Sequence, residues 1–585
     1  MPYPYRRALR GWLHQDKLLL MNKREIASVL EEIAFFLELK GENFFKVKAY
    51  SNAARVIESL PEEPAVLVQK GLLASVKGIG PTLAGTVSEL VTTGVSTLHQ
   101  ELKASFPAGV QEIAEIPGLG PKKIKAIYDQ LNVGSVGELE YACVENRLVG
   151  LPGFGAKTQE KILAGIRQLK RRQGFHLFAN VIDEADRILE AVRDIAGVTH
   201  ADLAGEIRRR VEIVQSIALV VAGAKPPALL EALRAVPDTT QVEYLPESSS
   251  VSARSPQGLP VSIKVCGTEG YGLALWLETG NSEHMEAVRQ RARAGTMPKA
   301  QTEEAVYAAA GLPYIAPELR EGHGEIALAE TGNLPVLIEA DQVQGIFHSH
   351  TIYSDGSATL EQMVESARAL GYRYIGISDH SQSAFYANGL KEDRIRAQHA
   401  EIAAVQKKFG GIRIFKGIEA DILVDGAMDY PDGVLAGFDF VIASVHSRFN
   451  LSEGDQTRRI CRALANPYVT MLGHPTGRLL LSRDGYRVDM RKVLDTAAEH
   501  GKIVEINANP HRLDLDWRLC AYAKEKGVRF SINPDAHSTE GLAVVPFGVN
   551  VARKGGVTAA DVVNTLPAKA MAGCLQSIRS RAIKD

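Results

Sequence analysis

Residues 347–356 read Phe-His-Ser-His-Thr-Ile-Tyr-Ser-Asp-Gly and supply two histidines, His348 and His350, followed by the carboxylate of Asp355. Similar short clusters of histidines and carboxylates recur toward the C-terminus, at Asp379-His380, Glu419, His446, His474 and Asp535-Ala536-His537. Six of the 15 histidines fall in these clusters, whereas a lone histidine is more often a hydrogen-bonded packing residue. Imidazole and carboxylate are ligands of divalent transition metals. The pattern therefore predicts a site for several metal ions.

Most of these clusters come directly after a short apolar run. The runs span residues 374–378, 440–444, 469–472 and 528–532, and they alternate with amphipathic segments such as 360–370 and 491–500. This alternation is typical of parallel strands joined by helices. In such a barrel the carboxyl ends of the strands carry the functional side chains to one rim. We therefore expect the clusters to meet at the rim of a C-terminal barrel.

The composition limits the class of protein. A chain of 585 residues exceeds the size of one hydrophobic core, so we expect three to four domains. With 45% hydrophobic residues, 23% charged residues and a net charge of −2, the chain is not uniformly basic, and any DNA contact must be local. No run is long enough to span a membrane. The five cysteines are widely spaced, which is typical of reduced thiols, and we expect a cytoplasmic protein.

After an extension at 1–20 without clear periodicity, the N-terminal part has helical periodicity from about residue 24 to 173. It contains three copies of a turn in which an apolar residue is followed by Gly-x-Gly. Two glycines allow a tight turn that opens into a helix, whose N-terminal N–H groups attract phosphate. One such turn is more often a simple connection between helices. Three copies resemble helix-hairpin-helix motifs and predict DNA binding without base readout, through Lys77, Gly78, Gly80, Gly118, Gly120, Lys122, Lys123, Gly153, Gly155 and Lys157.

The middle of the chain, from residue 175 to about 329, has a mixed pattern. Strands are predicted at 217–221 and 261–265, and helices at 282–294 and 302–310. A connection containing proline at 333–341 then leads to the barrel.

This order of parts resembles the bacterial family X DNA polymerases over nearly the whole chain from Met21. The resemblance implies a multidomain fold: an all-α helix-hairpin-helix region, an α/β nucleotidyltransferase-like palm with a helical thumb, and a distorted (β/α)7 barrel. The implied domains are a helical DNA-binding domain at 21–100, a fingers-like region at 101–174, the palm at 175–263, the palm end and thumb at 264–329, a linker at 330–343 and a PHP (polymerase and histidinol phosphatase) domain at 344–585.

The polymerase carboxylates of that family are absent from the matching positions. In the family a Gly-Ser-x-Arg-Arg turn precedes a strand with Asp-x-Asp, and a later strand adds a third Asp; together they hold two magnesium ions. Here the turn reads Gly205-Glu206-Ile207-Arg208-Arg209, and the three positions are occupied by Ser216, Ala218 and Ser262. Neutral side chains cannot hold the cations that phosphoryl transfer needs. We expect DNA polymerase activity to be absent or very weak, and neither Glu206 nor Glu212 to restore it.

The C-terminal part resembles PHP domains in every ligand motif. The resemblance implies that His348, His350, Glu419 and Asp535 bind one metal, that Glu419 bridges to a second held by His446 and His474, and that Asp355, His380 and His537 hold a third. Zinc, manganese or iron suits such ligands. Paired cations can activate a water and flank an in-line displacement. Arg512 is the candidate for a phosphate clamp, and Asp379 and Asp421 for partners that orient the ligands.

The predicted function is that of a DNA-repair nuclease. By resemblance the barrel is a 3′-5′ exonuclease, with 3′-phosphatase or abasic-site endonuclease action as further options, and Glu419, His446, His474, Asp535 and Arg512 are its catalytic candidates. We expect a monomer in the bacterial cytosol or nucleoid that acts on gapped, nicked or single-stranded DNA 3′ ends without sequence preference and without a membrane partner. Three alternatives stay open: an active family X polymerase, a small-molecule phosphatase of the histidinol-phosphate type, and a DNA-binding scaffold with structural metals.

Overall fold

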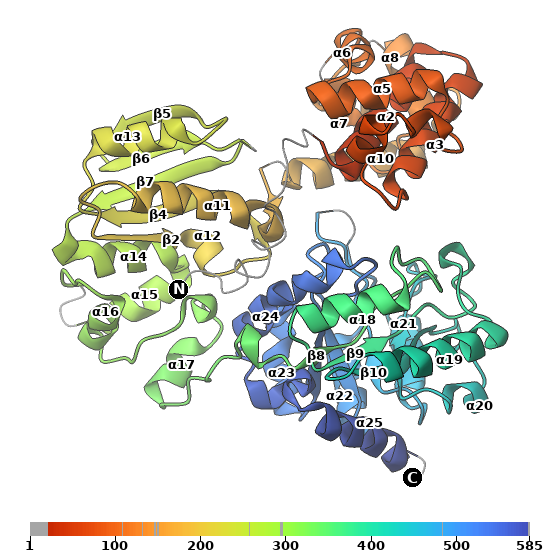
Figure 1. The fold of residues 1–585 in the computed structure, drawn as a ribbon. Helices are drawn as coiled ribbons and strands as arrows, with labels where there is room; N and C mark the ends of the chain where they lie inside the picture. The colour runs from red at the N-terminus through yellow and green to blue at the C-terminus, as the bar shows by residue number, and fades with distance from the viewer. Residues whose placement is uncertain are drawn as a thin grey trace. The chain divides into compact units, whose positions relative to one another are not determined.

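The computed structural model describes residues 21–107, 109–131, 133–144, 148, 151–172, 174–256, 258–292, 297–481 and 484–582, so the predicted extension at 1–20 lies outside the described residues. The chain forms two compact units, Met1–Gln173 and Gly174–Asp585. Figure 1 shows a helical N-terminal unit and a second unit with a mixed α/β region and a barrel of parallel strands. The predicted fold class is confirmed. None of the described helices is long and apolar enough to span a bilayer.

The first unit consists of short helices with one apolar core. In helix α2 (Lys23–Lys40), Asn22 and Glu25 form a capping box at the N-terminal end, and Ile26, Leu30 and Ile33 are buried at helical spacing. The helices that follow α2 are joined by short connections: α3 (Phe44–Glu58), α4 (Pro64–Gln69), α5 (Pro81–Thr93), α6 (Thr97–Ala104), α7 (Gly109–Ala114), α8 (Pro121–Leu131), α9 (Val136–Val144) and α10 (Ala156–Arg172). The helices α5, α8 and α10 each begin directly after one of the three glycine turns.

The middle region of the second unit is built on a five-stranded sheet in the order β2-β4-β7-β6-β5. Only β4 and β7 are parallel neighbours. The strands are β2 (His200–Ala204), β4 (Ile217–Ala222), β5 (Thr240–Leu245), β6 (Ser250–Arg254) and β7 (Pro260–Cys266). A separate sheet consists of two antiparallel strands, β1 (His176–Leu177) and β3 (Ile213–Val214). The helices of this region are α11 (Phe178–Arg193), α12 (Gly205–Arg208), α13 (Pro226–Ala235) and α14 (Tyr271–Thr279).

Three helices continue the middle region toward the barrel: α15 (Ser282–Arg289), α16 (Glu303–Ala309) and α17 (Glu325–Glu330). The helix predicted at 282–294 ends earlier, at Arg289. The helix predicted at 302–310 is shorter at both ends because Thr302 is its N-cap and Ala310 its C-cap. The strands predicted at 217–221 and 261–265 are present and slightly longer.

The barrel has seven parallel strands in sequential order: β8 (Gly345–Ile346), β9 (Tyr374–Ile377), β10 (Arg413–Asp421), β11 (Phe440–Ser444), β12 (Met471–Leu472), β13 (Ile503–Asn507) and β14 (Arg529–Asn533). The predicted run 469–472 yields only two strand residues. The helices around it are α18 (Leu360–Ala369), α19 (Glu392–Lys408), α20 (Asp432–Leu435), α21 (Glu453–Leu464), α22 (Met490–Glu499), α23 (Cys520–Glu525), α24 (Val545–Lys554) and α25 (Ala568–Ala582).

The edge strands β8 and β14 are linked at two places, so the barrel is nearly closed. At the rim, Ser349 and Ala536 form a parallel bridge. Below this bridge, the Asn564 amide nitrogen donates to the carbonyl oxygens of Gly345 in β8 (2.9 Å) and of Ile532 in β14 (3.0 Å), and its side-chain oxygen accepts from the Ile532 N–H (2.8 Å). One buried side chain thus satisfies backbone groups that two open sheet edges would leave unpaired.

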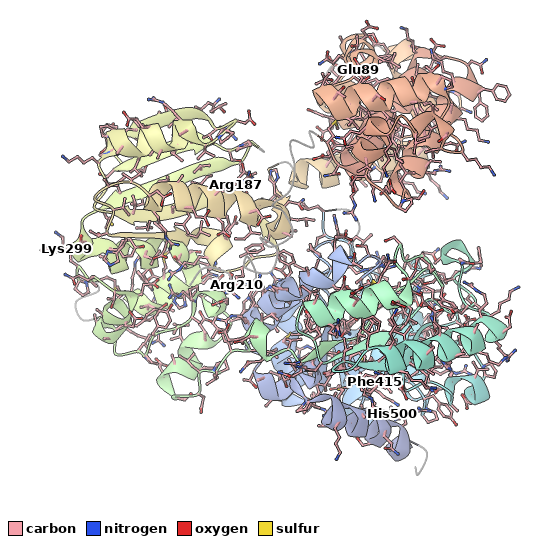
Figure 2. The ribbon with its side chains drawn as sticks, viewed as in Figure 1. Glu89, Arg187, Arg210, Lys299, Phe415 and His500 are labelled. Carbon is pink, nitrogen blue, oxygen red and sulfur yellow. The ribbon has the colours of Figure 1, made fainter. Side chains whose placement is uncertain are left out.

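Aromatic side chains fill the N-terminal half of the barrel. The ring of Phe347 lies 4.8 Å from that of Phe440 and 5.7 Å from that of Phe415, which Figure 2 labels. Gly417 makes room for this cluster, because a Cβ there would lie 2.1 Å from Phe440 Cζ. Helix α25 packs Met571 and other apolar residues against the same rings. The interior of the barrel is therefore a packed hydrophobic core, as in other small barrels, and this core supports the strand ends that form the rim.

Buried charges join the middle region to the barrel within the second unit. Glu318 accepts from Arg210 Nε at 3.0 Å and from Arg553 Nε at 2.9 Å, and Arg210 also donates to Asn550 Oδ1 at 2.8 Å. Figure 2 labels Arg210, which reaches from the loop after α12 to α24. Because both guanidinium groups share Glu318, removing this buried carboxylate would take a counter charge from both of them.

A buried lysine makes the stability of the barrel depend on pH. Lys502 is 2% exposed and donates to the carbonyl oxygens of Asn466 (3.0 Å) and Val469 (2.8 Å). Burial lowers its pKa from the usual 10.5 to about 8. Between about pH 8 and 10.5 the unfolded chain binds more protons than the folded chain, so this group adds stability as pH rises, by up to about 3 kcal/mol.

Chemical denaturation at several pH values measures this effect. We expect the free energy of unfolding of the wild type, relative to Lys502→Met, to increase from pH 8 to pH 10.5. Parallel curves for the two proteins across this window would show that the ammonium is not destabilised by burial.

Candidate metal centre

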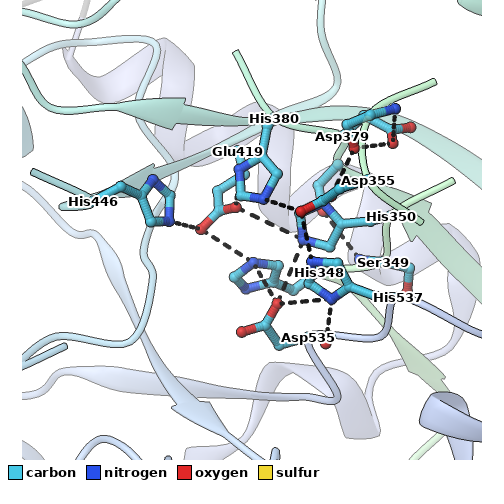
Figure 3. Close-up of polar contacts among 12 residues, drawn as sticks. His348, Ser349, His350, Asp355, Asp379, His380, Glu419, His446, Asp535 and His537 are labelled. Atoms are coloured by element: carbon cyan, nitrogen blue, oxygen red, sulfur yellow. Dashed lines mark hydrogen bonds and ion pairs between the residues drawn. The ribbon is translucent and has the colours of Figure 1, made fainter. Parts of the chain in front are cut away.

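The predicted ligands converge at the carboxyl ends of the barrel strands (Figure 3). His348, His350 and Asp355 follow β8, and His380 follows β9. Glu419 lies in the last part of β10, while His446 and His474 follow β11 and β12; Asp535 and His537 follow β14. The structure thus brings together all nine side chains that the sequence nominates as metal ligands: His348, His350, Asp355, His380, Glu419, His446, His474, Asp535 and His537.

Glu419 lies at the centre of this cluster and is fully buried. Its Oε1 is 2.9 Å from His474 Nε2, 3.1 Å from His446 Nε2 and 3.2 Å from His348 Nε2. Its Oε2 is 2.9 Å from His380 Nδ1. Burial by itself raises the pKa of this carboxyl, but the histidines, His446 first, hold it well below its usual range. Glu419 is therefore an ionised carboxylate with both oxygens directed at imidazoles.

Four overlapping sets of ligand atoms lie close enough to hold a cation. They are His350, Asp355, His380 and His537; His348, Glu419 and His474; His348, His350 and Asp535; and His380, Glu419 and His446. Glu419 occurs in two of the sets, as expected of a bridging carboxylate. The three residues predicted to hold the third ion, Asp355, His380 and His537, fall in one set, which also includes His350. Because the sets share residues, the assignment of each ligand to one ion stays a prediction.

The electrostatics of the cluster fit cations. Burial lowers the pKa of His446, but the carboxylates of Glu419 and Asp421 outweigh it and raise the value to about 9. For His380, Glu419 and Asp355 outweigh burial and raise the pKa to about 10. In contrast, burial and the nearby His537 and His380 lower the pKa of His350 to about 3, so its ring is neutral. The centre thus favours positive charge and also presents a neutral imidazole.

Ring nitrogens that lack a well-formed hydrogen bond support the same interpretation. Both ring nitrogens of His350 and Nε2 of His348 are buried and have no hydrogen bond of good geometry among the described residues. Buried polar atoms are otherwise nearly always satisfied. The backbone is also unusual here, since His348 and Asp535 have φ values of +56° and +51°, a left-handed conformation that is uncommon outside glycine. The residue types, their burial and the ring nitrogens without a hydrogen bond all fit a metal centre.

Further carboxylates contact the candidate ligands or the loops that carry them. Asp421 Oδ1 accepts from His446 Nδ1 at 2.6 Å, as predicted for an orienting partner. When the ring binds a metal, an N–H at Nδ1 would leave the lone pair at Nε2 for the cation. Asp379 accepts from the backbone N–H groups of Thr351 (2.7 Å) and Ser354 (3.1 Å) and thereby orders the loop that carries Asp355.

Glu505 is an orienting residue that the sequence reasoning missed. It is fully buried in β13, and its Oε1 accepts from His348 Nδ1 at 2.7 Å while its Oε2 accepts from the His474 N–H at 2.7 Å. The available signal was a carboxylate inside the apolar run 503–507, because a buried strand carries a charge only where it has partners.

Arg512, the predicted phosphate clamp, lies at the edge of the same centre. Its Nε is 3.2 Å from Asp535 Oδ2, and its side chain is one-fifth exposed. The guanidinium therefore touches a candidate ligand and reaches solvent, the placement that a substrate-binding cation requires.

The three glycine turns have the same local geometry. Gly78, Gly118 and Gly153 have φ values of +97°, +86° and +83°. An added Cβ would meet nothing within 4 Å at Gly80, Gly118, Gly120, Gly153 or Gly155. The turns thus present open backbone at the start of α5, α8 and α10. Among the nearby lysines, Lys123 donates to the Gly118 carbonyl oxygen at 3.2 Å and so helps to hold its own turn. The other lysines predicted to contact DNA are Lys77, Lys122 and Lys157.

In the middle region, Ala218 of β4 pairs directly with Ser262 of β7, and Ser216 precedes β4. Among the described residues, the groups able to hold a metal lie only in the barrel. The carboxylates near the paired strands have other partners: Glu206 accepts from the Gln215 N–H at 2.7 Å, and Asp202 accepts from Tyr271 Oη at 2.7 Å.

Comparison with known protein families agrees with both units. A helix-hairpin-helix domain model matches residues 21–96, and a SAM-like helix-hairpin-helix tandem model matches residues 70–132 and 110–168. A PHP domain model matches residues 347–509.

Individual proteins extend this similarity. A probable phosphatase of Caldicellulosiruptor saccharolyticus is 34% identical to this chain, over 34% of this chain and 81% of its own length. A probable phosphatase of Caldicellulosiruptor bescii is 32% identical, over 32% of this chain and 78% of its own length. The DNA polymerase/3′-5′ exonuclease PolX of Bacillus subtilis (strain 168) is 35% identical over 561 residues, which cover 93% of this chain and 97% of that protein. The chain therefore belongs to the bacterial family X DNA polymerases of the PolX type, with helix-hairpin-helix motifs and a C-terminal PHP domain.

Proposed function

We propose that this chain is a metal-dependent DNA phosphoesterase that removes nucleotides from 3′ ends during DNA repair. The observation that carries the proposal is Glu419, a buried carboxylate with four imidazoles within 3.2 Å, at the rim of a PHP barrel. The name of the Bacillus relative, which includes a 3′-5′ exonuclease, supports the direction of cleavage. The protein acts as a monomer in the bacterial cytosol or nucleoid.

Divalent ions, manganese, zinc or iron, would supply a polarised water and positive charge at the scissile phosphate. The residues of this chain do the positioning. Asp421 and Glu505 fix the ring orientation and proton of His446 and His348. Arg512 binds a phosphate oxygen of the substrate through the edge of its guanidinium that faces solvent. Together these groups hold a phosphodiester beside the ligands His348, His350, Glu419 and Asp535.

A family X DNA polymerase is the second candidate function, and the name of the Bacillus relative favours it. We propose instead that nucleotide transfer has been lost in this chain. Ser216, Ala218 and Ser262 occupy the positions of the family's carboxylates, and neutral side chains do not hold the magnesium ions that phosphoryl transfer uses. In this proposal the middle region holds DNA.

The experiment that tests the main proposal compares substrates. Purified protein, stripped of metal with a chelator and reloaded with manganese or zinc, is incubated with 3′-labelled gapped, nicked and single-stranded DNA and with histidinol phosphate. We expect release of single nucleotides from the 3′ end that depends on added metal. DNA with an abasic site and DNA with a 3′-phosphate test for further activities: internal cuts would show an abasic-site endonuclease, and released phosphate would show a 3′-phosphatase. Turnover of histidinol phosphate with intact DNA would replace the proposal with a small-molecule phosphatase, and inert metal-loaded protein that binds DNA would indicate a scaffold.

The glycine turns lead to a further prediction about DNA affinity. We propose that they bind the sugar-phosphate backbone through their N–H groups and through Lys77, Lys122 and Lys157. In the triple variant with alanine at these three lysines, the plot of log affinity against log salt concentration should become less steep, by about 0.9 for each duplex phosphate that the protein no longer neutralises. Fluorescence anisotropy at several salt concentrations measures the slope. Alanine at the exposed Lys407 and Lys408 of the barrel is a control for charge, and an unchanged slope in the triple variant would exclude the turns as the interface.

A further inference from the structure

Arg478 connects the candidate metal centre to the middle region. It lies on the loop that follows β12 and begins near His474, and it faces the loop that follows β13 and carries Arg512. We infer that Arg478, held from the middle region by Glu212, is a positioning residue that sets the place of Arg512 for the reaction. This inference rests on the proposed phosphoesterase function.

The contacts of Arg478 on the barrel side are with the backbone next to Arg512. Arg478 Nε donates to the Arg512 carbonyl oxygen at 2.9 Å, and Nη2 donates to the carbonyl oxygen of Leu513. Nη1 donates to Asp516 Oδ2 at 2.6 Å. Leu513 has a φ of +45°, which is uncommon for a branched residue and persists only when the surroundings hold it. The planar guanidinium provides that support with several donors at fixed angles, which a lysine cannot do.

Asp514 makes the two loops one structural unit. Its fully buried carboxylate accepts from the backbone N–H groups of Thr476 (2.8 Å) and Gly477 (3.0 Å), two and three residues after His474. On the same loop, Arg512 reaches Asp535 Oδ2 at 3.2 Å, and that oxygen also accepts from Asn507 Nδ2 at 3.0 Å. A shift of the loop would therefore move Arg512 relative to the candidate ligands.

Glu212 brings the middle region into this arrangement. Its Oε1 lies 3.6 Å from Arg478 Nη2, and it is 7% exposed. The residue lies between α12 and β3, and its carbonyl oxygen accepts from the Phe178 N–H at the start of α11 at 3.0 Å. Because Arg478 is largely buried, its charge needs carboxylates around it, and Glu212 is the one supplied from outside the barrel. The middle region thus supports the nuclease site directly, as well as the DNA.

Steady-state kinetics of 3′-nucleotide release in the full-length, manganese-loaded protein test the inference. Arg478→Lys keeps the charge but removes the planar fork, and we expect kcat to fall by about 100-fold, since a displacement of about 1 Å at a positioning residue has an effect of that size. Arg512→Gln should give a similar loss. If Arg478 acts through Arg512, the double variant should be no slower than Arg512→Gln alone. Glu212→Gln should lower kcat by several-fold in the wild-type background and not in the Arg512→Gln background.

Arg518→Gln is the matched control, because Arg518 also pairs with Asp516, at 3.1 Å, but its side chain is half exposed and its guanidinium donates to Asp516 rather than to the backbone of residues 512 and 513. It should retain full activity. Metal content and melting temperature are measured for every variant, and Glu212→Gln, an isosteric change, keeps the test valid if Arg478→Lys does not fold. Losses that multiply in the Arg478→Lys/Arg512→Gln variant, or normal kcat in Glu212→Gln, would overturn the inference alone. A wild type that leaves DNA intact would overturn the proposed function and the inference together.

Discussion

Glu419→Gln is expected to reduce the rate of 3′-nucleotide release by at least about a thousandfold, equivalent to a barrier increase of about 4 kcal/mol. The substitution keeps the size of the side chain and removes its charge. Glu419 faces His348, His446 and His474 through one oxygen and His380 through the other, so an amide would turn an NH₂ group toward at least one imidazole. Without this carboxylate, two of the four candidate ligand sets lose their only acidic member.

The measurement combines a nuclease assay with the metal content of the purified variant. Fewer bound ions should accompany the loss of activity, because the buried histidines then lack a counter charge. Glu525→Gln on the exposed side of α23 serves as the control and should behave as the wild type. A folded Glu419→Gln protein with a loss of less than tenfold and unchanged metal content would show that the reaction does not use this centre.

Template-directed primer extension is expected to stay at background with either magnesium or manganese. The assay is best done in the Glu419→Gln background, where 3′ ends are not degraded, beside the Bacillus PolX as a positive control. The expected difference is large because phosphoryl transfer depends almost entirely on positioning and on bound cations. In this chain the position in β4 that would face Ser262 is Ala218, which offers no oxygen at all.

A gain-of-function variant makes this prediction sharper. Aspartate at Ser216, Ala218 and Ser262 restores three carboxylates on the paired ends of β4 and β7 and should increase incorporation if these positions alone limit the reaction. The proposed loss of polymerase chemistry would be contradicted if the protein with Ser216, Ala218 and Ser262 unchanged incorporated nucleotides in a magnesium-dependent reaction that Glu206→Gln abolishes.

The sequence was sufficient to predict which histidines and carboxylates meet because parallel strands bring their carboxyl ends to one rim. Any histidine or carboxylate that directly follows a buried run therefore belongs to that rim, whatever its distance in sequence. His446 after β11 and His474 after β12 are examples, and both lie at Glu419 in the structure. The helix-hairpin-helix turns were equally accessible, because tight turns need glycine at defined positions.

Other features could not be predicted because they depend on ångström-scale geometry or on contacts between distant segments. Which histidine shares an ion with which carboxylate depends on side-chain rotamers, and His380 reaches both Glu419 and Asp355. The pair Glu212 and Arg478 joins residues far apart in sequence, and no periodic pattern marks it. Helix ends such as Arg289 are set by capping and tertiary packing more than by hydrophobic periodicity.

Asn564 has a consequence for the order of events during synthesis. This residue closes the seam between β8, which is made first, and β14, which is made last, and it follows every candidate metal ligand in the chain. While the ribosome is still adding the segment before Asn564, the two outer strands lack the amide that joins them. The nascent chain therefore lacks this link between its two outer strands until Asn564 has been added, and we expect a chain that stalls earlier to hold the candidate ligands less rigidly.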